Sequence, residues 1–180
     1  MADIIEWDPK IEVLTDKISR NFLADAYAIA WHDSEDPVTK TGAIIINPHL
    51  SDFVGAGANH FPAGLNPTEE QKRDRDYKLK HIIHAEPAAI YAAASIKGGT
   101  KGAIMYMPWV PCTDCAKAII DSDIVTFVGH KQMIIKTPER WRESTEYALE
   151  LLRKCGVGLY MYDGKIGSVK SLFNGEVWEP

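Results

Sequence analysis

The sequence predicts an α/β protein whose partly parallel sheet is covered by helices on both faces. An amphipathic stretch near the N-terminus precedes two β-rich runs, and beyond residue 100 strand and helix patterns alternate. Such alternation requires crossover connections, which make neighbouring strands parallel and place helices against the sheet. The chain has 180 residues, 46% of them hydrophobic and 25% charged, as is usual for one compact domain. We therefore expect a single domain over residues 1–180.

The first half of the chain predicts a helix, a hairpin, a loop and a second helix. Apolar residues recur at spacings of three and four over residues 11–33, which indicates an amphipathic helix. Residues 43–47 and 53–59 predict two strands joined by a short turn. The second run contains two glycines, which indicate a place where backbone or ligand approaches closely. Residues 60–80 are polar and predict a loop insertion with room for a short helical turn. The alanine-rich residues 85–97 predict a helix that ends at a Gly-Gly pair.

The second half of the chain alternates regularly. Strands are predicted at residues 103–109, 124–129 and 157–164. Helices are predicted between them, at residues 112–123 and 138–156.

Charge and composition favour a small ligand in the cytoplasm. The formal net charge of −5 lacks the basic footprint of a nucleic-acid-binding protein. No stretch approaches membrane-spanning length, and the first residues lack the basic region of a signal peptide. We therefore predict a cytoplasmic protein that acts neither on nucleic acid nor at a membrane.

A metal site is indicated by a C-x-x-C pair and a histidine. Cys112 and Cys115 are three positions apart, and a cytosolic pair of this kind is more often a metal or redox pair than part of a disulfide framework. A catalytic zinc ion typically takes three protein ligands and leaves a fourth position open, and His84 completes the three. His81 is a rival ligand three residues earlier, but it lacks a nearby downstream glutamate, so we place it on the surface or around the site. We expect Cys155 to be a small packing residue.

The spacing of these residues predicts that each half of the site begins a helix. His84 and Glu86 are two residues apart, so they would face nearly opposite sides in the middle of a helix. They can share one site only in the first turn, where Pro87 is tolerated because its amide has no intrahelical partner. Pro111 precedes Cys112 in the same way. Two helix N-termini aimed at one point favour thiolates and metal binding.

The motifs H-A-E and P-C-x-x-C match the zinc nucleoside deaminase pattern. The stretches "SEDPVTKTGAIIINP", "GAGANHFPAGL" and "PCTDCAKAIIDSDI" further resemble the deoxycytidylate (dCMP) deaminases, over about residues 24–162. This resemblance implies a three-layer α/β/α sandwich around a five-stranded mixed sheet. It also implies a homo-oligomer, a dimer or a hexamer, that deaminates a free pyrimidine nucleotide, with dCMP giving dUMP. No cysteine precedes Cys112, so we expect one catalytic Zn²⁺ per chain.

The resemblance also implies roles for individual residues. Glu86 is the expected proton shuttle: it takes a proton from a zinc-activated water, which can attack C4 of cytosine, and returns protons to N3 and to the leaving amino group. Asn59 is expected to contact the nucleotide, with Thr39 and Lys40 near its phosphate. We also expect Ala85, between His84 and Glu86, to contact the substrate.

For several other residues the sequence is compatible with two roles. His60 either lines the pocket or is solvated. Asp114 either compensates the dipole of its helix or contacts the amine or ring of the substrate. Trp109 is either a core aromatic or a ring at the pocket mouth, and its place at the end of a strand favours the pocket. The insertion contains five cations, namely Lys72, Arg73, Arg75, Lys78 and Lys80. Such charge runs are mostly solvated faces, although one of these cations could close over a phosphate.

Three departures from the dCMP deaminases leave the substrate open. Ala88 stands where many of them carry asparagine, and Pro87 and Trp109 are also unusual. The same zinc chemistry could act on a modified cytidylate, a nucleoside, a free base such as guanine, or an adenosine of transfer RNA, although the acidic balance argues against RNA. A non-catalytic zinc scaffold is a further alternative. Glu86 and the presence of only three convincing ligands argue against that scaffold.

Overall fold

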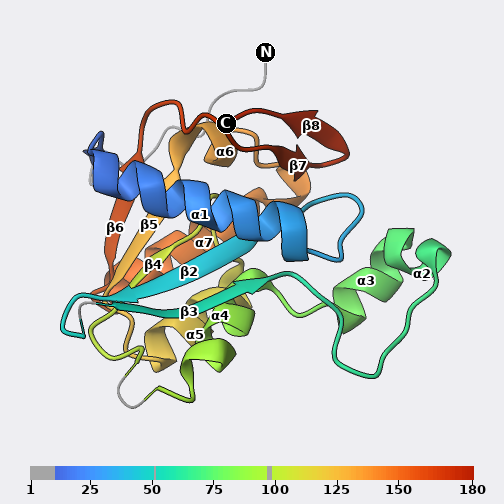
Figure 1. Ribbon diagram of the computed structural model, residues 1–180, viewed down its shortest axis with the longest axis horizontal. Helices are drawn as coiled ribbons and strands as arrows, with labels where there is room; N and C mark the ends of the chain where they lie inside the picture. The colour runs from blue at the N-terminus through green and yellow to red at the C-terminus, as the bar shows by residue number, and fades with distance from the viewer. Residues whose placement is uncertain (1–10, 51, 97–98) are drawn as a thin grey trace.

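The fold is built on a mixed β-sheet, as the computed structural model shows for residues 11–50, 52–96 and 99–180 (Figure 1). Its strands are β1 (Glu12–Leu14), β2 (Gly42–Asn47), β3 (Asp52–Ala58), β4 (Ile104–Tyr106), β5 (Thr126–His130) and β6 (Gly158–Tyr162). Their order in the sheet is β1-β6-β5-β4-β2-β3. The first four of these are mutually parallel, whereas β2 and β3 run antiparallel to their neighbours. The predicted α/β class is confirmed, but the described residues form six strands in this sheet rather than five.

Helices cover both faces of the sheet and complete three layers. One face carries α1 (Lys17–Asp33), and the other carries α4 (Ala85–Ala93), α5 (Thr113–Asp121) and α7 (Glu139–Lys154). The side chains of β2 alternate between the layers, as a strand period of two requires. Ile44 packs in the cluster under α1, whereas Ala43 and Ile45 pack in the cluster under the other three helices.

The sixth strand lies where the sequence predicted the start of a helix. Residues 11–16 have apolar residues at helical spacing, but Asp16 caps α1, and its side chain accepts a hydrogen bond from the backbone N–H of Ser19 at 2.8 Å. The helix therefore begins at Lys17, and β1 before it pairs in parallel with β6, with Leu14 opposite Tyr162. Capping and edge pairing outweigh the helical pattern here.

The insertion at residues 60–80 contains two short helices, α2 (Glu69–Arg73) and α3 (Arg75–His81). Thr68 and Gln71 form a capping box at the start of α2, and the Asp74 side chain caps α3. Figure 1 shows both helices standing apart from the sheet. The insertion is thus more helical than the single short turn that the sequence indicated. A further short helix, α6 (Lys131–Ile134), follows β5.

A C-terminal hairpin was not predicted. It consists of β7 (Ser171–Phe173) and β8 (Glu176–Trp178), and its turn residues Asn174 and Gly175 have φ angles of 53° and 85°. An Asn-Gly pair between apolar runs is a strong hairpin signal, because both residues tolerate positive φ. The hairpin hydrogen-bonds the loop before β2: the N–H of Lys40 donates to the carbonyl of Leu172, and the N–H of Gly175 donates to the carbonyl of Val38, both at 2.8 Å.

In the described part of the chain, no helix is both long and apolar enough to cross a lipid bilayer.

Helix α4 lies very close to strand β3. A Cβ atom added to Gly57 would come within 2.5 Å of the Ala88 Cβ and the Ala89 backbone nitrogen, and Gly55 is crowded by the same helix. The predicted close approach at these glycines is therefore that of a helix backbone. It determines where α4 begins relative to the sheet.

We expect Gly57→Ala to destabilise the protein by about 1–3 kcal/mol, because the added methyl group must push α4 away from β3. Urea unfolding monitored by circular dichroism measures the change. Ala92→Ser, on the exposed side of α4, is the control and should stay within about 0.5 kcal/mol of wild type. Equal stability of Gly57→Ala and wild type would contradict the close packing of α4 on β3.

Candidate active site

Two helix starts meet at one end of the sheet and bring the predicted ligands together. His84 is the N-cap residue of α4 and Cys112 is the N-cap residue of α5, and both have extended backbone. Neither side chain makes a capping hydrogen bond, so both are available to the site. Cys115 lies in the first turn of α5 and is buried. The prediction that each half of the site begins a helix is confirmed.

The ligand atoms have the spacing of a tetrahedral zinc site. The Nδ1 atom of His84 lies 3.6 Å from the Sγ atom of Cys112 and 3.3 Å from that of Cys115. Tetrahedral coordination with ordinary Zn–N and Zn–S bonds puts nitrogen and sulfur ~3.5 Å apart. All three ligand atoms lie within 4.8 Å of one another, and among the described residues they form the one such group. His84, Cys112 and Cys115 therefore fit a catalytic Zn²⁺ with one coordination position left open.

The electrostatics of this cluster favour a thiolate. A hydrogen bond with Cys115 lowers the pKa of Cys112 to about 4, against the opposing effect of burial. Hydrogen bonding with Cys112 raises the pKa of His84 to about 9, and the contact with Cys112 together with burial raises the pKa of Cys115. A thiolate is the form of cysteine that binds metal.

Glu86 is a buried carboxyl group beside the cluster. It is only 2% exposed, and its burial raises its pKa to about 7. As the second residue of α4, it stands in the same helix turn as Pro87. The charge of His84 and a hydrogen bond with Cys115 act in the opposite direction and lower this pKa, but burial has the larger effect.

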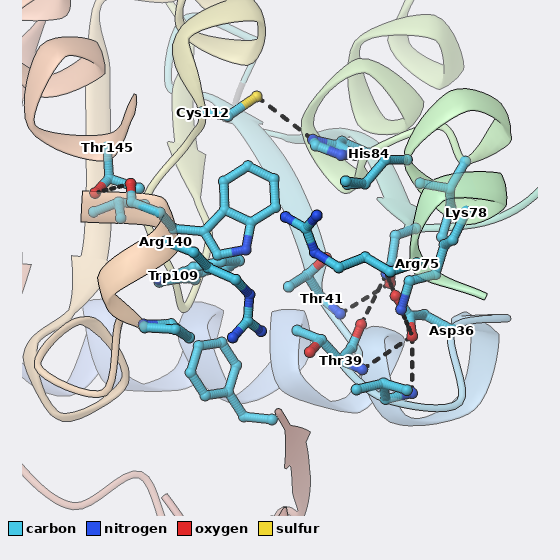
Figure 2. A pocket seen from close by; sticks show the side chains of 18 of the residues that line it. Asp36, Thr39, Thr41, Arg75, Lys78, His84, Trp109, Cys112, Arg140 and Thr145 are labelled. Carbon is cyan, nitrogen blue, oxygen red and sulfur yellow. Dashed lines mark hydrogen bonds and ion pairs between the residues drawn. The ribbon is translucent and has the colours of Figure 1, made fainter. Parts of the chain in front are cut away.

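A cavity that is partly open to solvent extends outward from these residues (Figure 2). Six of the predicted catalytic, metal-binding and substrate-binding residues line it, namely Thr39, Asn59, His84, Glu86, Trp109 and Cys112. The cavity lies beyond the carboxyl ends of the parallel strands, where ligands of α/β proteins usually bind.

The loop before β2 forms one rim of the cavity, and Asn59 holds it in place. The Oδ1 atom of Asn59 accepts hydrogen bonds from the Ser34 hydroxyl at 2.6 Å and the Thr41 N–H at 2.9 Å. Its amide donates to the Thr39 carbonyl at 2.9 Å and to the Asp36 carboxylate at 3.4 Å. All four hydrogen-bonding positions of this amide are thus occupied by the protein.

Asp36 connects this rim to the insertion. Its carboxylate accepts a hydrogen bond from the N–H of Thr39 and forms a 2.8 Å ion pair with Lys78 on α3. The side chains of Asp36 and Lys78 are 6% and 12% exposed. Removing one partner of such a buried ion pair costs several kcal/mol, because the other charge is left unpaired. The pair therefore holds α3 against the loop before β2.

Aromatic side chains form the opposite wall. Trp109 packs edge-on against Trp141 and Phe173, with ring centroids 6.0 Å and 5.0 Å away. Its indole N–H donates to the Thr137 hydroxyl at 2.9 Å. Because Phe173 belongs to β7, the C-terminal hairpin contributes to this wall.

Lys40 and His60, two predicted substrate contacts, do not line the cavity. The ammonium group of Lys40 donates to the carbonyls of Trp31 and Ser34, at 2.8 Å and 3.1 Å. The Nδ1 atom of His60 lies 2.8 Å from the Ala58 carbonyl, and the backbone of His60 pairs with residue 83, next to the metal ligand. Both residues are anchored to protein backbone at these positions.

Asp114 and Ala85 also lie outside the cavity lining. Asp114 points to solvent with its side chain 89% exposed and pairs with Lys117 one turn later, whereas Ala85 is fully buried in the core at the start of α4. His81 stacks on Tyr77 instead of joining the metal ligands. Cys155, expected to pack inside, is exposed beyond the end of α7, so that expectation is wrong.

The sequence predicted only some of the positively charged side chains that line the cavity. Its lining includes four cations, namely Arg73, Arg75, Lys78 and Arg140. The first three come from the insertion, where the sequence indicated a cation near a phosphate. Arg140, in the first turn of α7, was missed because nothing in the sequence near Pro138 places that turn beside the metal site.

Comparison with known proteins identifies the family. The family described as the cytidine and deoxycytidylate deaminase zinc-binding region matches residues 16–131. A deoxycytidylate deaminase of Mus musculus is 36% identical over 119 residues, which are 61% of this chain and 64% of that protein. One of Enterobacteria phage T4 is 42% identical over 84 residues, 47% of this chain and 42% of that protein. The chain thus spans less than two thirds of the length of these relatives.

The fold has solved counterparts. A dCMP deaminase from the cyanophage S-TIM5, crystallised in complex with dCMP and dUMP, aligns with a TM-score of 0.61 over 84% of this chain and 99% of its own, at 17% identity. The RibD protein of Acinetobacter baumannii aligns with a TM-score of 0.54 over 81% of this chain and 35% of its own, at 19% identity. These likenesses confirm the three-layer fold. Because the family match covers well over half of its residues, this chain belongs to the cytidine and deoxycytidylate deaminase zinc-binding family.

Proposed function

We propose that this protein hydrolyses the exocyclic amine of a free pyrimidine nucleotide, converting dCMP and water into dUMP and ammonia. The observation that carries the proposal is the buried Glu86 carboxyl group beside the His84, Cys112 and Cys115 ligand cluster, at the base of one cavity. A structural zinc site has no need for such a carboxyl group and normally has four protein ligands. The names of the relatives, which are deoxycytidylate deaminases, support the choice of dCMP.

The chemistry divides between the metal and Glu86. When bound, zinc supplies a Lewis acid that brings the pKa of water towards neutrality. Glu86 accepts a proton from the attacking water and delivers it to N3 of the ring. A second proton passes through the same carboxyl group to the amino group, which leaves C4 as ammonia. The carboxyl group acts first as a base and then as an acid, so it must stay within reach of both atoms.

Two residues of the cavity lining, Thr39 and Trp109, are our proposed direct substrate contacts, and Asn59 is proposed to hold Thr39 in position. Thr39 lies on the rim, Asn59 braces that rim from within, and Trp109 offers a ring face and edge on the opposite wall. Two walls that are held by hydrogen bonds favour a flat ring between them, because little ordering entropy is lost on binding.

We also propose a cytoplasmic homo-oligomer, a dimer or a hexamer, with one deaminase domain over residues 1–180. The family resemblance supports the oligomer, and the packing of the described helices around one sheet supports the single domain. The net charge of −5 supports a free nucleotide over nucleic acid as the substrate.

We expect ammonia release from dCMP to exceed that from every other compound in a substrate panel. The panel contains dCTP, 5-methyl-dCMP, CMP, cytidine, deoxycytidine, guanine and adenosine, each assayed with zinc-loaded protein by a coupled ammonia assay. A preference for another member would reassign the substrate and keep the reaction. No ammonia from any member would contradict the proposal and favour a zinc scaffold.

Glu86→Gln should lower kcat for dCMP by about 10²–10⁴-fold, because the amide cannot accept and return the proton. Zinc content, measured by plasma mass spectrometry, should stay that of wild type, since Glu86 is not a metal ligand. Glu146→Gln, at an exposed position on α7, controls for the loss of a carboxylate. Wild-type turnover by the Glu86→Gln protein would refute the assigned role.

Cys115→Ser should reduce bound zinc from about one ion per chain to a small fraction, because one of three ligands is lost. Cys155→Ser is the matched control: this cysteine is exposed beyond the end of α7, so its replacement should leave zinc content unchanged. Full zinc occupancy in the Cys115→Ser protein would show that the metal, if bound, is held elsewhere.

A further inference from the structure

We propose that Arg75 and Arg140 bind the phosphate of the nucleotide between them, and that Asn174 in the C-terminal hairpin positions Arg140. The two arginines are called the arginine clamp below. This inference rests on the proposed nucleotide substrate and assigns the part of the site that separates a nucleotide from a nucleoside.

The charge of the cavity is opposite to that of the whole chain. The chain carries a formal net charge of −5, but the lining has four cationic side chains against two carboxylates, Asp36 and Glu86. Lys78 is already paired with Asp36, and Glu86 lies at the buried end. The excess positive charge therefore belongs to arginines, which suits an anionic group on the ligand.

The members of the clamp come from different elements and approach from different sides. Arg75 is the first residue of α3 in the insertion, and Arg140 lies in the first turn of α7. Figure 2 shows the two side chains extending into the cavity from opposite directions, Arg75 from the side of α3 and Arg140 from the side of α7. Among the described residues, the Arg75 guanidinium has no hydrogen-bond or ion-pair partner, so its donors are available to a ligand in the cavity.

Arg140 is held in place by the hairpin turn. Its guanidinium donates to the Oδ1 atom of Asn174 at 2.7 Å, and the backbone N–H of Asn174 donates to the hydroxyl of Thr39 at 3.1 Å. Asn174 therefore joins two residues of the cavity lining, one on each side of the mouth. A guanidinium has five N–H donors, so the bond to Asn174 leaves others for a ligand.

Geometry and chemistry together point to phosphate. The reacting ring must lie against the metal ligands and Glu86 at the buried end, so the 5′ group extends towards the mouth where the clamp stands. The planar fork of a guanidinium matches the oxygens of a phosphate with paired, charge-assisted hydrogen bonds. Arg140 and Asn174 both lie beyond residues 16–131, the part of the chain that the family match covers.

The test measures binding by calorimetry, using zinc-loaded Glu86→Gln protein as the parent so that dCMP is not consumed. We expect Arg75→Ala and Arg140→Ala each to raise the Kd for dCMP by about 10- to 100-fold, as the loss of charge-assisted hydrogen bonds does. The Kd for deoxycytidine, which has no phosphate, should change less than about twofold. Lys80→Ala on α3 and Lys154→Ala on α7 are matched controls outside the cavity lining.

Asn174 is tested as a positioning residue. Asn174→Gly removes the side chain without straining the positive φ, and should raise the Kd for dCMP about 3- to 10-fold. Asn174→Asp keeps the acceptor and should restore binding. In the catalytically active background, Asn174→Gly should raise KM for dCMP with kcat unchanged, because uniform binding is lost, whereas Asn174→Asp should keep the wild-type KM.

Each outcome decides between the two proposals. Weaker binding of dCMP by the arginine variants, together with ammonia release from dCMP by the wild type, supports both the clamp and the proposed function. A wild type that releases no ammonia from dCMP overturns the proposed function, yet the clamp stands if the Kd for dCMP still depends on the arginines. A change of less than about twofold in both arginine variants, or no binding of dCMP to the parent, overturns the clamp.

Discussion

The site depends on one constraint, which is that the first turns of α4 and α5 must meet within the reach of one metal ion. His84 and Cys112 are the residues just before these helices, and their ligand atoms are 3.6 Å apart. Because neither helix start uses a side-chain cap, these positions are free for metal binding. Two glycines in β3 let α4 lie against the sheet, where any Cβ would collide with its backbone. Close packing of a helix on a strand thus sets the metal geometry.

Around this buried centre, the mouth is assembled from segments far apart in sequence. Asp36 joins the loop before β2 to the insertion through Lys78, and Asn174 joins the same loop to α7 through Arg140. The bonds made by Lys78 and Arg140 are charge-assisted and therefore stronger than neutral ones, whereas the bond from Asn174 to Thr39 is neutral. The result is a local field opposite in sign to the net charge of the chain, built by placement rather than composition. A nucleotide would meet cations at the mouth before it reaches Glu86.

The fold class could be predicted because strand and helix periods differ and alternate along the chain. Two elements were missed for separate reasons. Residues 12–14 also fit a helical spacing, and only pairing with β6 and the cap at Asp16 make them a strand. The hairpin of β7 and β8 was overlooked although its Asn-Gly turn is visible in the sequence. The helices of the insertion are only five and seven residues long, too short for a clear periodic signal.

The sequence by itself determined the metal centre, because its constraints are local: spacing within one helix turn decides whether His84 and Glu86 can share a site, and the C-x-x-C spacing does the same for the cysteines. It did not determine the substrate wall. Lys40 lies next to the predicted phosphate region but its ammonium group is taken by backbone carbonyls, whereas Arg140 is more than fifty residues from His84 and lines the same cavity. Only the tertiary structure decided these positions, since side-chain direction at the mouth follows from how loop, insertion and hairpin pack together.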